Sequence, residues 1–234
     1  MLISGIQKFT LLDYPEKIAT IIFTAGCNFR CGFCYNREFV LPEEIEKIKD
    51  SFIFEDTVLN FLKTRVGKID GVVISGGEPT LQKDLEDFID KVKELGFLVK
   101  LDTNGTNPKI LKKLVENKKI DFVAMDIKTD FNNYKNLVGQ NINLDDIKES
   151  LEFLKKDVIP YEFRTTVVQG IHTPEVFEEM GKMLKGARKI YLQNFRSQTT
   201  LDSKFTSKKS LSKEELEKAV EILSKYIHKV LVRG

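Results

Sequence analysis

The feature of this sequence that most constrains its fold is the alternation of short strand-like runs with longer segments of helical period. Apolar residues recur at helical spacing from Leu81 to Leu95 and again from Leu144 to Leu154, so each segment presents one apolar face. Such alternation predicts repeated βα units around a parallel sheet, with the helices on the outside. The strands are expected at Ile18–Thr24, Gly71–Ser75, Leu98–Asp102, Asp121–Asp126, Glu162–Val168 and Lys189–Phe195.

Six such units predict an α/β chain that folds as a partial (β/α)6 TIM-like barrel, although periodicity alone does not distinguish this from an open doubly wound sheet. Residues 1–17 are expected to form a short N-terminal extension. A closing helix is expected after the N-cap Ser212, with Glu215 at the capping-box position, and residues 228–232 add a short strand. No Pro- or Gly-rich linker interrupts the pattern, so residues 1–234 are expected to form a single domain.

Composition and charge limit the kinds of partner. Lys and Arg total 37 against 35 for Asp and Glu, so the charges nearly balance and a nucleic-acid partner is not expected. Met1–Thr10 lacks the basic segment and apolar core of a signal peptide, and no apolar run approaches the roughly 20 residues of a membrane span. We therefore expect a cytoplasmic protein without a membrane partner.

Three cysteines, Cys27, Cys31 and Cys34, follow the first predicted strand within eight consecutive positions. Their odd number and close spacing are unlike the framework of a disulfide-bonded secreted protein. Thiolates at C-x3-C-x2-C spacing can hold three corners of a cubane iron–sulfur cluster, and without a fourth cysteine one iron is left open to another ligand. The alternative is a structural zinc site, which needs a fourth ligand such as His172 or His228, both far away in the sequence. The spacing favours the cluster.

The cysteine motif, with aromatic Phe33 just before the third cysteine, resembles the signature of the radical S-adenosylmethionine (SAM) superfamily. The resemblance implies a 4Fe-4S cluster bound by Cys27, Cys31 and Cys34, with the amino and carboxylate groups of SAM on the open iron and Phe33 near the adenine. Simple core packing is the alternative for Phe33. The resemblance also implies that an external donor reduces the cluster, that SAM is cleaved reductively, and that the resulting 5′-deoxyadenosyl radical abstracts hydrogen.

A second motif follows the second predicted strand, at the edge where barrel active sites form. Gly76, Gly77 and Glu78 resemble the GGEP motif of this superfamily, whose backbone and carboxylate meet the amino group of SAM. Glycine permits close backbone approach, and a carboxylate complements an ammonium group. A plain Gly-Gly turn would be the better interpretation of the motif alone, but its position one strand after the cysteine loop favours the binding role.

Two further segments resemble those of the glycyl radical enzyme activases, a subgroup of this superfamily. They are Asp102, Thr103 and Asn104 after the third predicted strand, and Asp126 and Lys128 after the fourth. The resemblance implies that these residues lie near SAM, and that the acidic ones can help to hold a monovalent cation beside its carboxylate. Lys128 is expected to meet the SAM carboxylate or the substrate backbone. Without the resemblance, Asp102 would be interpreted as a cap and Lys128 as a solvated side chain.

Three weaker elements indicate the substrate. Asp13 stands in an Asp-x-Pro element before the first strand, where related activases contact the glycine-bearing loop of their partner; a structural turn is the alternative. Tyr35 and Asn36 follow Cys34 directly and resemble a Tyr-Asn element of the same group, and Arg164 lies where an activase-like arginine is expected. These four residues are predicted to bind the substrate.

The resemblance is closest to the anaerobic ribonucleoside-triphosphate reductase activating proteins. It implies an enzyme that generates a glycyl radical on that partner and takes electrons from a flavodoxin- or ferredoxin-type donor. A radical SAM enzyme that acts on a small molecule, such as a 7-carboxy-7-deazaguanine synthase, is the main alternative, and a non-catalytic metal-binding module is another. Residues 197–210 are expected to form a mobile surface connection rather than a binding element.

Overall fold

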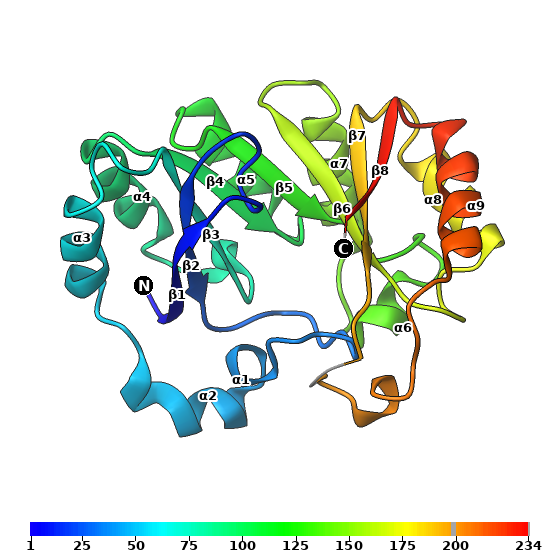
Figure 1. Ribbon diagram of the computed structural model, residues 1–234, viewed down its shortest axis with the longest axis horizontal. Coiled ribbons are helices and arrows are strands. Elements are labelled where there is room, and N and C mark those ends of the chain that lie inside the picture. The colour runs from blue at the N-terminus through cyan, green and yellow to red at the C-terminus, as the bar shows by residue number, and fades with distance from the viewer. Residues whose placement is uncertain (198–199, 234) are drawn as a thin grey trace.

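Eight strands form one curved sheet in the computed structural model, which describes residues 1–197 and 200–233 (Figure 1). The strand order follows the sequence: β1 is antiparallel to β2, and each later pair of neighbours is parallel. β1 and β8 are therefore the two edges of a partial barrel. The strands are β1 (Ile3–Thr10), β2 (Ala19–Thr24), β3 (Gly71–Gly76), β4 (Leu98–Thr103), β5 (Phe122–Asp126), β6 (Tyr161–Val167), β7 (Lys189–Asn194) and β8 (Lys229–Arg233).

Helices connect the parallel strands and cover the outer face of the sheet (Figure 1). The closing helix begins with the predicted capping box, because Ser212 accepts the Glu215 N–H and the Glu215 carboxylate accepts the Ser212 N–H. The helices are α1 (Arg37–Val40), α2 (Pro42–Ile48), α3 (Glu55–Lys63), α4 (Leu85–Glu94), α5 (Pro108–Glu116), α6 (Tyr134–Val138), α7 (Leu144–Leu154), α8 (Pro174–Met183) and α9 (Lys213–Ser224), with 3-10 turns at Lys49–Ser51, Pro79–Leu81 and Ser203–Phe205.

The six predicted strands are confirmed as β2 to β7, each within one residue of its predicted bounds, and β8 confirms the short C-terminal strand. The prediction for residues 1–17 missed β1, an edge strand rather than an extension. Residues 7–9 of this strand are exposed, and only its two end residues are buried. An edge strand with so few buried positions lacks the apolar run by which the buried strands were predicted.

The two faces of the sheet bury different kinds of side chain, because successive residues of a strand point to opposite faces. The outer face packs against the helices and forms the main apolar core, with Ile22, Ile74 and Val99 as examples. The inner face carries a smaller apolar cluster near the amino-terminal ends of the strands, which includes Ile21 and Phe122. The carboxyl-terminal ends of the strands are therefore left to polar side chains.

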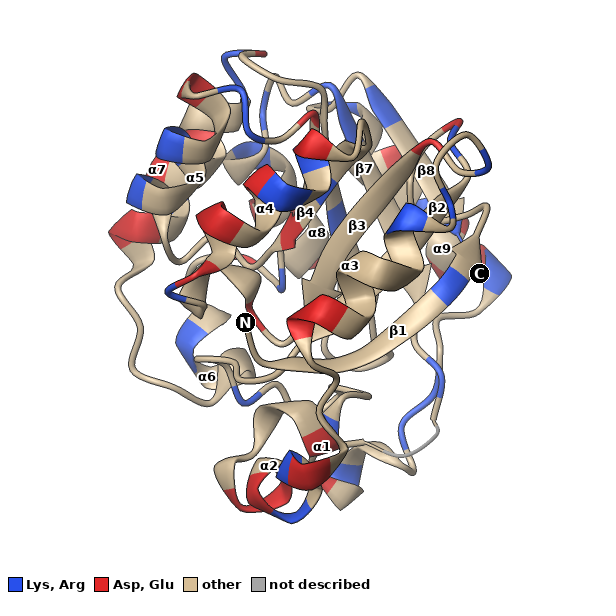
Figure 2. Ribbon diagram, turned by 90° about the vertical axis from the view of Figure 1, so that its left-hand side faces the viewer, with Lys and Arg blue, Asp and Glu red and all other residues tan. Residues whose placement is uncertain are grey.

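Charged residues are spread over the helices, with basic and acidic residues interspersed (Figure 2). This distribution agrees with the near-balance of charge in the sequence. Within the described part of the chain, no helix has both the length and the apolar character needed to span a membrane.

Candidate active site

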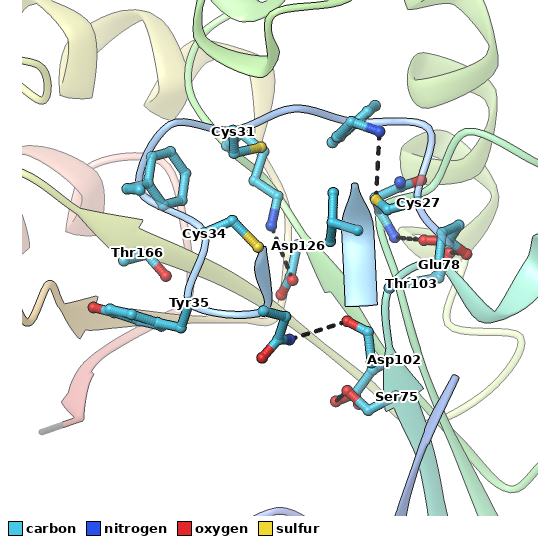
Figure 3. Close-up of a pocket in the computed structure, with 18 of the residues that line it drawn as sticks. Cys27, Cys31, Cys34, Tyr35, Ser75, Glu78, Asp102, Thr103, Asp126 and Thr166 are labelled. Atoms are coloured by element: carbon cyan, nitrogen blue, oxygen red, sulfur yellow. Dashed lines mark hydrogen bonds and ion pairs between the residues drawn. The ribbon is translucent and has the colours of Figure 1, made fainter. Parts of the chain in front are cut away.

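A pocket opens at the carboxyl-terminal edge of the parallel strands, beside the cysteine loop (Figure 3). It contains about 800 Å³ of empty space, part of which is open solvent. Every predicted site residue except Asp13 lines this pocket. Parallel strands end at the same edge of the sheet, so the loops that follow them lie close together there. Motifs that are far apart in the sequence therefore meet at this pocket.

The three cysteines lie on the loop between β2 and α1, and all three line the pocket (Figure 3). Arg30 braces the loop, because its guanidinium donates to the carbonyl oxygens of Cys27 (2.6 Å) and Phe29 (2.7 Å). Burial raises the pKa of Cys27 to about 11 and that of Cys31 to about 12. Ligation of iron therefore requires these thiols to release their protons.

The arrangement of these thiols suits a cluster better than a single metal ion. Among residues 1–197 and 200–233, no three His, Cys, Asp or Glu side chains are grouped so as to hold one ion. A cubane spreads its three thiolates over three irons, so its ligands stand farther apart than those of one zinc ion. His172 is also engaged elsewhere, because its Nδ1 accepts the Val168 N–H (3.0 Å) and its Nε2 contacts the Lys128 carbonyl (2.9 Å).

Two glycines hold the turn after β3 against the start of the cysteine loop. The Gly77 N–H donates to the Thr24 carbonyl (2.8 Å), and the Glu78 N–H donates to the Gly26 carbonyl (2.8 Å). A Cβ atom on Gly77 would lie 2.0 Å from the Gly26 oxygen, and Gly76 adopts a φ of +113°, which residues with side chains rarely adopt. These glycines therefore allow two backbone segments of the chain to pack closely against each other beside the pocket.

Glu78 is completely buried and accepts four hydrogen bonds. Its Oε1 accepts the Thr80 N–H (3.1 Å), the Thr80 hydroxyl (2.6 Å) and the Thr103 hydroxyl (2.8 Å), and its Oε2 accepts the Asn104 N–H (2.6 Å). Burial raises the pKa of this carboxyl, against the opposing effect of the four donors. Glu78 thus joins the turn after β3 to the loop after β4, and Oε2 retains a lone pair for a further donor.

Charged side chains of alternating sign form a row on the inner face of β4, β5 and β6. Four of them lie in the floor of the pocket, and the fifth, Lys100, lies beneath it. Asp102 accepts hydrogen bonds from Lys100 Nζ (2.5 Å) and Arg164 Nη1 (3.0 Å), while Asp126 accepts them from Arg164 Nε (2.8 Å) and Lys128 Nζ (3.1 Å). Burial would raise the pKa of both carboxyls, but the neighbouring cations outweigh it: they lower the pKa of Asp102 and bring that of Asp126 to about 2. Two carboxylates face three cations, so the row carries a net charge of +1.

Tyr35 and Asn36 stand at the side of the pocket. The Tyr35 ring stacks on Phe195, with ring centroids 6.0 Å apart, and its hydroxyl accepts the Arg196 N–H (2.5 Å). Asn36 donates from Nδ2 to the Gly76 carbonyl (3.2 Å). Tyr35 is 39% exposed, so a molecule that enters the pocket can reach it.

Residues 200–210 form a partly exposed connection that also contacts the cysteine loop. Two backbone N–H groups of this segment donate to carbonyl oxygens of the cysteine loop, Cys34 included (3.0 Å each), and Phe205 packs against Phe33 with ring centroids 6.1 Å apart. The segment therefore supports the cysteine loop, and Phe33 packs against it while also lining the pocket. Residues 198–199 of the predicted connection lie outside the described residues.

Asp13 is the one predicted site residue that the structure places away from the others. It lies in the β1–β2 hairpin, where Thr10 pairs with Ala19 at the amino-terminal end of β2, whereas the pocket lies beyond Thr24 at the opposite end. Its carboxylate accepts the Thr10 hydroxyl, as the structural-turn alternative requires. A contact between Asp13 and a partner stays a prediction, and such a contact would lie at the far edge of the sheet from the pocket.

Sequence reasoning missed polar residues of the inner face, Lys100 and Thr166 among them. Lys100 lies two residues before Asp102 on β4, and Thr166 lies two residues after Arg164 on β6. Alternation along a strand puts each of them on the same face as its predicted neighbour, and this was the signal that could have found them. Phe29 adds an apolar wall to the pocket, without any spacing that identifies it beforehand.

Comparison with known proteins agrees with this geometry. A sequence profile described as the radical SAM superfamily matches residues 21–185, which include the cysteine loop, the turn after β3 and the charged row. This chain belongs to the radical SAM superfamily. Radical SAM enzymes use a 4Fe-4S cluster and SAM, and both cofactors suit the pocket, which has three thiols on one side and a charged floor on the other.

Similar radical SAM proteins differ in how much of their length this chain covers. A Methanocaldococcus jannaschii protein, provisionally named a glycyl-radical enzyme activating enzyme, is 37% identical over 99% of this chain and 95% of that protein. A Pyrococcus horikoshii protein named a probable GTP 3′,8-cyclase is 29% identical over 71% of this chain but 52% of that protein. A Thermococcus kodakarensis 7-carboxy-7-deazaguanine synthase is 27% identical over 72% of this chain and 71% of that protein.

Solved structures share the fold of this radical SAM enzyme. Streptococcus suis SuiB bound to S-adenosylmethionine superposes with a TM-score of 0.63 over 92% of this chain and 52% of that chain, at 17% identity. The agreement at such low identity confirms the predicted partial barrel as the shared architecture.

Proposed function

We propose that this radical SAM enzyme is an activase that generates a glycyl radical on a partner enzyme, and that the partner is anaerobic ribonucleoside-triphosphate reductase. The observation that carries the proposal is the similarity to the M. jannaschii protein, which extends over 95% of a protein named for this activity. The two relatives named for small-molecule reactions are less identical, and the cyclase is covered over only 52% of its length.

In this proposal Cys27, Cys31 and Cys34 would hold the 4Fe-4S cluster. Reduced by a flavodoxin- or ferredoxin-type donor, the bound cluster would supply the one electron for cleavage of SAM to methionine, with one hydrogen atom taken from the substrate to give 5′-deoxyadenosine. The chain's own contribution is to orient SAM. Glu78 Oε2 accepts from the SAM ammonium, while the row with net charge +1 attracts the SAM carboxylate. Phe33 lies beside the adenine.

Polar groups of Arg164, Tyr35 and Asn36 suit recognition of a peptide backbone. Arg164 uses Nε on Asp126 and Nη1 on Asp102, and a guanidinium carries five N–H donors, so Arg164 retains donors for a carbonyl oxygen. Tyr35 and Asn36 offer a hydroxyl and an amide at the same pocket. A glycine in an extended loop, without a side chain, would present its Cα hydrogen and its two flanking peptide groups to these donors and acceptors.

The proposal is tested by activating the partner. The protein is reconstituted anaerobically with iron and sulfide, and is then incubated with SAM, a chemical reductant and the anaerobic ribonucleotide reductase of the same organism. We expect a glycyl radical in the electron paramagnetic resonance spectrum, together with one 5′-deoxyadenosine for each radical. A partner whose radical-bearing Gly is changed to Ala is the control and should give no such spectrum. Cleavage of SAM without a radical on the unmodified partner would contradict the assignment.

A small-molecule reaction is the second candidate, because the deazaguanine synthase is covered over 71% of its length. The same reconstituted protein distinguishes the two functions. Formation of 7-carboxy-7-deazaguanine from its precursor, or SAM-dependent consumption of GTP, in the absence of any partner protein would favour the small-molecule function over the activase.

A further inference from the structure

Lys100 is a fully buried lysine beneath the pocket floor, next to a residue that was predicted to help to hold a monovalent cation. β4 places Lys100 and Asp102 on the same inner face, and Lys100 Nζ lies 2.5 Å from Asp102 Oδ1. The ammonium also lies 6.0 Å from the centroid of the Phe122 ring. Burial lowers the pKa of Lys100, and the charge of Asp102 opposes this shift. Lysine is almost never fully buried unless its charge is paired, so the contact with Asp102 stabilises the ammonium form.

The carboxylate oxygens that would bind a monovalent cation are already bonded to cations of the chain. Asp102 Oδ1 accepts from Lys100, and its Oδ2 accepts from Arg164. Asp126 Oδ1 accepts from Arg164, and its Oδ2 accepts from Lys128. A hard cation binds through several oxygen ligands, and here it would add a fourth positive charge beside three others. The residues present do not fit a monovalent cation.

We infer that the Lys100 ammonium takes the place of a monovalent cation beside Asp102, so that SAM binding by this enzyme does not require Na⁺ or K⁺. A tethered ammonium supplies the same single positive charge as an alkali ion, and it is present whatever the salt. The inference concerns the SAM side of the pocket and does not depend on which substrate the enzyme activates. If the inference proves wrong, the proposed activase function is therefore unaffected, because the two are tested by different measurements.

The first test measures SAM affinity of the reconstituted wild-type protein in KCl, NaCl and choline chloride at one ionic strength. Choline is too large to enter a carboxylate site made for an alkali ion. We expect the three dissociation constants to agree within about twofold. Clearly tighter binding of SAM in K⁺ or Na⁺ than in choline would overturn the inference, because it would show that an alkali ion still binds beside SAM.

The second test removes the ammonium. Lys100→Met keeps most of the apolar stem, but it leaves Asp102 Oδ1 without its cation. Removing one positive charge from beside the SAM carboxylate is expected to weaken SAM binding by roughly tenfold in choline chloride. K⁺ or NH₄⁺ should restore most of this loss, and K⁺ should also raise the melting temperature of the SAM-free variant more than that of the wild type. A loss that no monovalent cation restores would overturn the inference.

Two further variants separate the role of the ammonium from general effects of the substitution. Lys93→Met removes a lysine–aspartate pair of similar length (Lys93 to Asp121, 2.8 Å) at the amino-terminal edge of the sheet, and should change neither SAM affinity nor its response to salt. Lys100→Gln keeps a donor for Asp102 but not the charge, and should show the same dependence on K⁺ as Lys100→Met. If Lys100→Met does not fold, Lys100→Gln serves as the test. The inference would be overturned if Lys100→Gln bound SAM as tightly as the wild type and its SAM affinity did not respond to K⁺.

Discussion

Substitution of Glu78 tests whether its carboxylate binds SAM or only joins two loops. Alanine would remove the acceptor of four hydrogen bonds and would leave the backbone N–H groups of Thr80 and Asn104 buried without a partner. Each such group costs about 1–3 kcal/mol, so Glu78→Ala is expected to lower the free energy of unfolding by about 2–6 kcal/mol. That loss is a large part of the roughly 5–15 kcal/mol of a typical domain, and Glu78→Ala therefore reports on folding more than on binding.

Glu78→Gln is the more informative change because it keeps the size of the side chain. The amide oxygen can replace Oε1, but the amide nitrogen then faces the Asn104 N–H, so one buried donor is left unpaired, at about 1–3 kcal/mol. The loss of charge also weakens the proposed bond to the SAM ammonium by about 1.5–3 kcal/mol, which predicts roughly 10- to 150-fold lower SAM affinity. Urea denaturation measures the first quantity, and equilibrium dialysis of the reconstituted protein measures the second.

Thr103→Val is the matched control for Glu78→Gln. It removes one hydroxyl donor from Glu78, leaves the Gly105 N–H without its acceptor and keeps the charge of Glu78, so it is expected to cost about 2–4 kcal/mol of stability with little effect on SAM affinity. If Glu78→Gln loses stability as calculated but binds SAM as tightly as the wild type, Glu78 joins the two loops without contacting SAM, and the reasoning about the ammonium is refuted.

Two further predictions concern the cysteines and the β1–β2 hairpin. Changing any one of Cys27, Cys31 or Cys34 to Ala should abolish SAM cleavage, because all three thiols face one pocket; a single variant with full iron and sulfide content and normal cleavage would contradict the three-ligand assignment. Asp13→Ala should lower the melting temperature, because it removes the acceptor of the Thr10 hydroxyl, but it should leave 5′-deoxyadenosine formation without partner unchanged, since the hairpin lies at the far edge of the sheet. A selective loss of glycyl radical yield in that variant would support partner recognition by Asp13, whereas loss of SAM cleavage in a stably folded variant would be inconsistent with this placement.

The sequence predicted most of the barrel because β2 to β7 carry β-branched or aromatic residues between segments of helical period, and it missed β1 because only the two ends of that strand are buried. The site was predictable for a related reason. Cys27, Glu78 and Asp126 follow three different parallel strands, and parallel strands end at one edge. The same rule fails for Asp13, because an antiparallel strand pair turns at the opposite edge from the one where its parallel neighbours end.

Contacts between segments that share no periodic pattern could not be predicted. Phe205 packs on Phe33 from a polar stretch without regular spacing, so only the folded chain brings the two rings together. The contact of Gly77 with Gly26 likewise arises from the pairing of β2 with β3, and no feature of either glycine in the sequence indicates its partner. The sequence identified the residues of the turn after β3, but the structure supplies the reason why a side chain is excluded there.

A layer of side chains beneath the pocket floor helps to hold the charges of the floor in place. On β4, Lys100 lies two residues before Asp102, and on β6, Glu162 lies two residues before Arg164, so alternation stacks opposite charges on the inner face. Glu162 is completely buried, with Lys189 Nζ 3.8 Å from its Oε2. Burial would lower the pKa of Arg164, but Asp102 and the other nearby carboxylates, Glu162 included, raise it. Asp102 and Arg164 are therefore each stabilised by an opposite charge from below as well as from their sides. The pattern of charge exists before any ligand enters, and a site with such preorganised charges can orient the ammonium and carboxylate of SAM without rearranging itself.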